Sequence, residues 1–187
     1  MQKLKFKKKI LIGPSEIAGN AHSLKKALNL IGEDCTIFLT KPHPHHEPIC
    51  FIQKLHIFVS KIDVLIIRKL FRLGVYFIEY LMALYYIATK DVFIFYFGDS
   101  FLPFYIDLKI IKLLNKRSIM QFCGSDSRCP LIDGGLIRNL NAEDAVSLTN
   151  ETIKKLRIIE KYCDDILVNP FSAQLHEKKF INDHLVG

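Results

Sequence analysis

A dense group of polar side chains follows an apolar run near the middle of the chain. The run is "SIMQF", residues 118–122, and the residues after it read "CGSDSRCP". Gly124 permits a sharp turn, after which Ser125, Asp126 and Arg128 offer hydrogen-bond donors, acceptors and a cation. Such a group can bind a hydroxyl-rich or phosphorylated ligand. The alternative is a local turn, because short polar residues often satisfy their own backbone.

Two other polar loops also follow apolar runs. In "GPSEIAGN", residues 13–20, the glycines Gly13 and Gly19 permit close approach of the backbone to a ligand, or simply a tight turn, and Asn20 follows. The loop lacks the G-x-G-x-x-G pattern, which disfavours a dinucleotide-binding dehydrogenase.

The third loop, "FGDS", contains Gly98 and Asp99. A carboxylate such as Asp99 can bind substrate hydroxyls, whereas Ser100 is expected to cap the next helix. Three polar loops of this kind favour a shared pocket if the fold brings them to one edge.

The elements between these loops alternate between strand-length apolar runs and segments of helical period. This alternation predicts one domain, residues 1–187, with an α/β fold: a Rossmann-like parallel sheet with helices on both faces. The carboxyl ends of parallel strands meet at one edge, where ligands of such sheets bind. The expected strands are residues 9–13, 35–40, 91–97, 118–122 and 165–169, and the expected helices are residues 19–32, 100–116, 152–163 and 171–179.

The expected boundaries rest on local signals. Gly32 should end the first helix, and Thr149 or Asn150 should cap the helix before the last strand. Residues 124–145 are expected to form a polar loop that includes Gly134 and Gly135. The final "HLVG" is expected to open a further strand, so the chain is expected to be part of a longer protein.

The composition and charge of the chain limit the kinds of molecule expected to bind it. The chain has 187 residues, is 50% hydrophobic and carries a formal net charge of +7, which suits an anionic partner: nucleic acid, an acidic lipid surface or a phosphorylated small molecule. No nucleic-acid recognition motif is present, so nucleic acid is not the expected partner. Five cysteines without a C-x-x-C pair predict thiols in a reducing cytoplasm. His43, His45 and His46 could bind a metal with Cys50, but the interleaved prolines disfavour an ordered ligand set, and no metal is expected.

Residues 51–89 form an apolar and aromatic segment with a narrow cationic stripe. At about 100° per residue on one helix, the stripe contains Lys54, Lys61, Arg68, Arg72 and Glu79. One interpretation is a core helix, broken near Gly74, with a solvated stripe. The other is an interfacial helix whose cations Lys54, Lys61, Arg68 and Arg72 contact an anionic membrane.

Four motifs together resemble the N-terminal, acceptor-side domain of GT-B glycosyltransferases, in particular the family 4 group of bacterial surface-polysaccharide enzymes. The matching stretches are "GPSEIAGN", Phe97-Gly98, "CGSD" and Asn169-Pro170. In that family a Gly-rich loop follows the first strand, another strand ends in "FG", a third ends in "HGSD", and a later strand ends in "TP" or "SP". The resemblance spans essentially the whole chain.

The resemblance implies transfer of a sugar from a nucleotide-sugar to a glycan or lipid-linked acceptor at the cytoplasmic face of a membrane. It makes Asp99 and Asp126 the candidate catalytic residues. The substrate-binding candidates are Gly13, Gly19, Asn20, Gly98, Gly124, Ser125 and Arg128.

The chain also departs from the family. Cys123 replaces the usual histidine, Gly19-Asn20 replaces a glycine pair, and the C-terminal donor-binding domain is missing from these residues. We therefore expect the chain to need that domain, or a partner chain, for activity. The alternative is a non-catalytic accessory subunit that binds a membrane or a partner.

Overall fold

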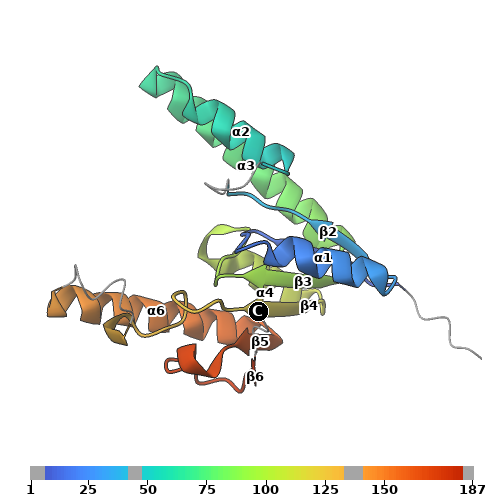
Figure 1. Ribbon diagram of the computed structural model, residues 1–187. Helices are drawn as coiled ribbons and strands as arrows, with labels where there is room; N and C mark the ends of the chain where they lie inside the picture. The colour runs from blue at the N-terminus through green and yellow to red at the C-terminus, as the bar shows by residue number, and fades with distance from the viewer. Residues whose placement is uncertain (1–6, 42–47, 133–140, 183–187) are drawn as a thin grey trace, which may run out of the picture.

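The computed structural model describes residues 7–41, 48–132 and 141–182, and its centre is a parallel β-sheet (Figure 1). Six strands pair in the order β2-β1-β3-β4-β5-β6, and every pairing is parallel. This confirms the predicted α/β fold. The strands are β1 Lys9–Gly13, β2 Asp34–Ile37, β3 Val92–Tyr96, β4 Arg117–Gln121, β5 Asp165–Val168 and β6 Ile181–Asn182.

Helices cover both faces of the sheet, as the sequence predicts. On one face Leu11, Phe93 and Met120 pack in a cluster with side chains of the helices α3, α4 and α6. On the other face Ile10 and Ile12 pack against α1. The alternation of neighbouring strand residues between the two clusters follows from the two-residue period of a strand. The described helices are α1 Asn20–Leu30, α2 Phe51–Ser60, α3 Leu65–Thr89, α4 Ile106–Leu113 and α6 Ala142–Tyr162.

The strand order reverses between β1 and β3. From β1 the chain first adds β2 on one side and then crosses back to add β3 on the other. A reversal of this kind opens a crevice at the carboxyl ends of the two strands, where open α/β sheets bind ligands. The loops after β1 and β3 are two of the three polar loops of the sequence.

One predicted helix boundary is confirmed and two are wrong. α1 ends at Leu30, and Gly32 follows with a left-handed φ of 89°. Ser100 does not cap α4, because Pro103 opens a 3-10 turn and α4 starts only at Ile106. The hydroxyl of Ser100 instead donates to the Leu102 carbonyl at 2.8 Å.

The cap expected at Thr149 or Asn150 lies inside a helix. α6 begins at Ala142, where the Asn141 side chain accepts a hydrogen bond from the Asp144 amide at 2.8 Å. Acidic residues in this first turn favour a helix start, and the Thr149 hydroxyl donates back to the Ala145 carbonyl. The polar loop after residue 124 therefore ends earlier than expected. Its Gly134-Gly135 pair lies outside the described residues.

The break expected at Gly74 is also wrong. α3 runs unbroken from Leu65 to Thr89, and the chain turns instead between Ser60 and Leu65, so that α2 and α3 form a helical hairpin. Figure 1 shows this hairpin projecting from the body of the sheet. The helix expected over residues 171–179 is also wrong, because only the end of the 3-10 turn Pro170–Ser172 falls within that range. The final "HLVG" lies outside the described residues.

Replacing Gly74 or Gly13 with alanine should change the stability of the protein in opposite directions. A Cβ at Gly74 meets nothing within 4 Å, so Gly74→Ala should raise the free energy of unfolding by about 0.5–1 kcal/mol, the usual gain for alanine within a helix. A Cβ at Gly13 would lie 2.0 Å from the Phe38 carbonyl oxygen, so Gly13→Ala should lower stability by about 1–3 kcal/mol. Urea unfolding of both variants tests this, and a loss of stability in Gly74→Ala would contradict the unbroken helix.

Candidate functional site

Asp99 follows β3 at the carboxyl edge of the sheet, where the strand order reverses between β1 and β3. The hydroxyl of Ser15, in the loop after β1, donates to Asp99 Oδ2, and Lys41 Nζ lies 3.0 Å from the same oxygen. The Asp99 side chain is 26% exposed, and neither of these two bonds uses its Oδ1. A carboxylate held in this way is fixed in position and able to accept a hydrogen bond from a ligand hydroxyl.

The loop that carries Asp99 has an unusual backbone. Phe97, Phe104 and Tyr105 have φ values of 61°, 56° and 58°, which bulky residues rarely adopt. Such conformations persist where the surroundings hold them, and they concentrate at functional sites. The carboxylate of Asp107, in the first turn of α4, supplies part of that support by accepting a hydrogen bond from the Phe101 amide at 2.6 Å.

The first polar loop places its own carboxylate at the start of α1. Gly19 adopts a left-handed φ of 79° just before the helix, and Asn20 is the first helical residue. The buried Glu16 accepts a hydrogen bond from the Ala21 amide at 3.2 Å and pairs with His22 Nδ1 at 2.8 Å. Helix N-termini attract anions, so an anionic ligand at this position would compete with Glu16. Gly13 is needed for close packing against Phe38.

The third polar loop folds back on itself. The buried Asp126 accepts hydrogen bonds from the Cys123 amide at 3.0 Å and the Gly124 amide at 2.8 Å, which is the local turn that the sequence left open. Burial raises the pKa of Asp126, and these backbone donors oppose the rise. Ser125 is exposed, and the guanidinium of the half-buried Arg128 lies close to Gly124.

Lys155 connects the second and third loops, and sequence reasoning missed it. Its Nζ lies 3.5 Å from the Phe97 carbonyl, and its side chain crosses Gly98 so closely that any Cβ there would overlap it. Burial lowers the pKa of Lys155, while the carboxylates of Asp126 and Asp99 act in the opposite direction. The residue comes from the middle of α6, whose N-terminal half extends past the sheet in Figure 1.

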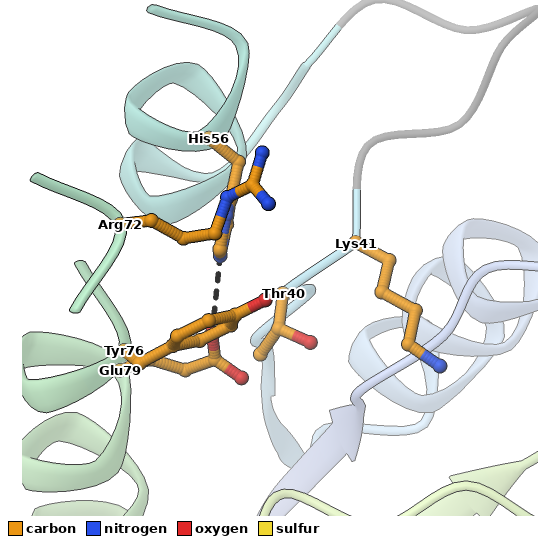
Figure 2. Close-up of a pocket in the computed structure, with 6 residues that line it drawn as sticks. All are labelled: Thr40, Lys41, His56, Arg72, Tyr76 and Glu79. Atoms are coloured by element: carbon orange, nitrogen blue, oxygen red, sulfur yellow. Dashed lines mark hydrogen bonds and ion pairs between the residues drawn. The ribbon is translucent and has the colours of Figure 1, made fainter. Parts of the chain in front are cut away.

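A pocket of about 310 Å³ adjoins this edge, between the α2–α3 hairpin and the segment after β2 (Figure 2). We call it the hairpin pocket. His56 Nε2 lies 3.1 Å from Glu79 Oε2, and the His56 ring packs against Tyr76 with centroids 5.5 Å apart. The lining residues are Thr40, Lys41, His56, Arg72, Tyr76 and Glu79. Lys41 therefore borders both the pocket and the Asp99 site.

The hairpin pocket combines a buried acid with cations. Burial raises the pKa of Glu79, and hydrogen bonds from His56 and Thr40 and the nearby Lys41 oppose that rise. Lys41 and Arg72 contribute positive charge, while Tyr76 and Thr40 contribute hydroxyls. This set of groups can bind a polyhydroxylated or phosphorylated ligand.

The cationic stripe of the sequence is divided between two helices. Lys54 is exposed on α2, Lys61 caps its end, and Arg68 lies half-buried on α3. Arg72 lines the hairpin pocket, and Glu79 is buried against His56, so the stripe is not one solvated face. The regular rotation of about 100° per residue is interrupted at the turn between α2 and α3, so residues of the two helices do not continue one common stripe.

Metal ligands do not cluster in the part of the chain that the structure describes, where groups of three or more His, Cys, Asp or Glu are absent. His43, His45 and His46 lie outside it. Comparison of the chain with protein-family models, with curated proteins and with solved structures finds no match.

Replacing Asp126 should cost stability. Asp126→Ala removes the acceptor of the half-buried Cys123 amide and of the buried Gly124 amide, so the free energy of unfolding should fall by about 1–3 kcal/mol. Asp126→Asn keeps one acceptor oxygen and should lose less. Thermal or urea unfolding measures both, and equal losses would contradict the role of the carboxylate in the turn.

Stability should fall with rising pH through the titration of Asp107. Burial raises its pKa from 3.8 to about 6, so between these values the folded chain keeps a proton that the unfolded chain has released. The contribution is complete below about pH 4 and is lost as the pH passes 6. Asp107→Asn mimics the protonated form.

Relative to the wild type, Asp107→Asn should gain up to roughly 3 kcal/mol between about pH 4 and pH 7. Urea unfolding across that range measures the difference. A difference that stays constant with pH would contradict the assignment.

Proposed function

We propose that this chain binds a hydroxyl-rich acceptor at the carboxyl edge of its sheet and forms the acceptor-side half of a glycosyltransferase. The observation that supports this most is the position of Asp99 at the strand-order reversal, beside the hairpin pocket. Rossmann-like sheets bind their ligands at this position.

The proposed reaction gives Asp99 a defined role. The acceptor hydroxyl oxygen forms a bond to the anomeric carbon while the bond from that carbon to the nucleotide diphosphate breaks, and the hydroxyl proton must leave. Asp99 accepts that proton or orients the hydroxyl through Oδ1, while Ser15 and Lys41 hold Oδ2. The nucleotide-sugar would be held mainly by a second domain or a partner chain.

The hairpin pocket extends the proposed acceptor site. Lys41 and Arg72 favour an acceptor that carries phosphate, and the hydroxyls of Thr40 and Tyr76 favour a sugar. Both features suit a glycan or a lipid-linked acceptor.

A non-catalytic binding subunit is the second candidate, and one observation favours it. The carboxylates of Glu16, Asp99 and Asp126 at this edge all accept hydrogen bonds from donors of the chain itself. Carboxylates that accept hydrogen bonds from their own chain can stabilise loops without taking part in catalysis.

The test compares two aspartates at opposite edges of the sheet. Saturation-transfer NMR with mono-, di- and phosphorylated saccharides should detect a ligand, and Asp99→Asn should weaken its binding at least tenfold because a charged hydrogen bond is lost. Asp165→Asn, which breaks an exposed ion pair with Arg117 at the other edge, is the matched control and should bind as the wild type does.

The results of these experiments distinguish a glycosyltransferase half from a non-catalytic binding subunit. Binding that Asp99→Asn leaves unchanged would remove Asp99 from the site, and no binding by the wild type would contradict the acceptor role. Saccharide binding without transfer of labelled sugar, measured with the full-length protein and a panel of nucleotide-sugars, would favour the non-catalytic subunit.

A further inference from the structure

Six large apolar side chains form a continuous strip along the outside of α3. They recur every three or four residues, which places them on one side of a helix. Each is between 44% and 72% exposed, and the strip extends for roughly 27 Å at the rise of an α-helix. We call Ile66, Leu70, Leu73, Phe77, Leu81 and Leu84 the outer strip.

The opposite side of α3 faces the protein and mixes apolar with polar side chains. Val75, Glu79, Ala83 and Ile87 are the buried residues of the helix, and Arg72 lines the hairpin pocket. Three of the four buried residues are apolar, so α3 carries apolar side chains on both sides and lacks the polar outer side of an ordinary surface helix.

The length and composition of α3 are those of a membrane-associated helix. Leu65–Thr89 has a window of mean hydropathy 1.3, and only 22% of that window is buried. A core helix of a soluble domain can be equally apolar, but it is mostly buried. Burial inside this chain therefore does not explain the apolar composition of α3.

The exposed apolar surface continues around the hairpin. Phe51 and Phe58 on α2 are exposed, as are Phe71 and Tyr85 on α3, and Figure 1 shows the hairpin standing out from the sheet. A rigid protein partner covers one side of such a projection. A fluid lipid phase can cover several sides at once, which favours a bilayer as the occupant.

The net positive charge of the hairpin favours a bilayer with anionic headgroups. Between residues 51 and 89 the cations are Lys54, Lys61, Arg68, Lys69 and Arg72, and the acids are Asp63 and Glu79. Glu79 is buried against His56 and so presents little charge to the outside. The exposed Lys69 precedes Leu70 of the outer strip, and the exposed Lys61 lies at the turn before α3, whereas Arg72 faces the hairpin pocket. Long cationic side chains such as Lys61 and Lys69 can pair with anionic headgroups.

We propose that the outer strip of α3 docks the protein on an anionic membrane surface, with α3 lying in the interface. The helix does not cross the bilayer in this arrangement, because its inner side stays packed on the sheet through Ala83 and Ile87. The proposal does not rest on the glycosyltransferase assignment, since a protein that binds no saccharide could still dock in this way.

The experiment uses the absence of tryptophan from the sequence. Phe77→Trp places a single fluorescent probe in the outer strip, and Leu30→Trp places one at the end of α1, which packs on the opposite face of the sheet and leaves Leu30 81% exposed. Each is mixed with vesicles of phosphatidylcholine, with or without about one third phosphatidylglycerol, a mixture that separates charge-dependent from apolar binding.

The Phe77→Trp emission should shift to shorter wavelength with the anionic vesicles and be quenched by brominated lipid, whereas Leu30→Trp should not change. In flotation assays the double variant Leu70→Gln/Leu81→Gln should bind at least tenfold less than the wild type. It should unfold like the wild type because both leucines are exposed. Lys61→Glu/Lys69→Glu should weaken binding to anionic vesicles.

Three results would overturn the proposal. The wild type could fail to float with either vesicle, Leu30→Trp could shift as much as Phe77→Trp, or binding could be equal with and without phosphatidylglycerol. A dimer in sedimentation experiments that Leu70→Gln/Leu81→Gln dissociates, without any flotation, would instead identify a second copy of the chain as the occupant.

Discussion

The parallel pairing of β1 with β3 is the constraint on which the candidate site depends. It joins two segments that are far apart in the sequence, with Gly13 opposite Phe95 at the ends of the strands. Ser15 can reach Asp99 only because both strands end at this edge. Lys41 joins the same carboxylate because β2 pairs with β1 in parallel register. One sheet edge thus collects an acid, a hydroxyl and a cation from three loops.

The polar edge is organised by its own hydrogen bonds before any ligand arrives. Glu16 occupies the start of α1, and Asp126 closes the turn after β4. Lys155 lies between the second and third loops, partly withdrawn from solvent. Such an arrangement limits the reorganisation needed to bind a ligand, but each internal bond is also a competitor that the ligand must replace or leave intact. Asp99 differs from the other two carboxylates in its partial exposure.

The sheet could be predicted from the sequence because buried parallel strands leave a strong apolar signal. "DVFIFYF" and "SIMQF" lack polar alternation; the first contains the central strand β3, and the second overlaps the central strand β4. The helix boundaries were harder, because Ser100 and Thr149 are good capping residues that here bond elsewhere. Lys155 and the hairpin pocket could not be found, because they depend on how α6 and the α2–α3 hairpin cross the sheet edge.

The α2–α3 segment shows most clearly what periodicity leaves undetermined. A repeat of three and four residues fixes which side chains share one side of a helix, but not which side faces the core. The pairing of Glu79 with His56 and the packing of Ala83 and Ile87 turn the mixed polar side of α3 inward. The same rotation that places Arg72 and Tyr76 in the hairpin pocket also places Leu70 and Phe77 outside. A polar pocket beneath the hairpin and an apolar strip above it are therefore two consequences of one orientation of α3.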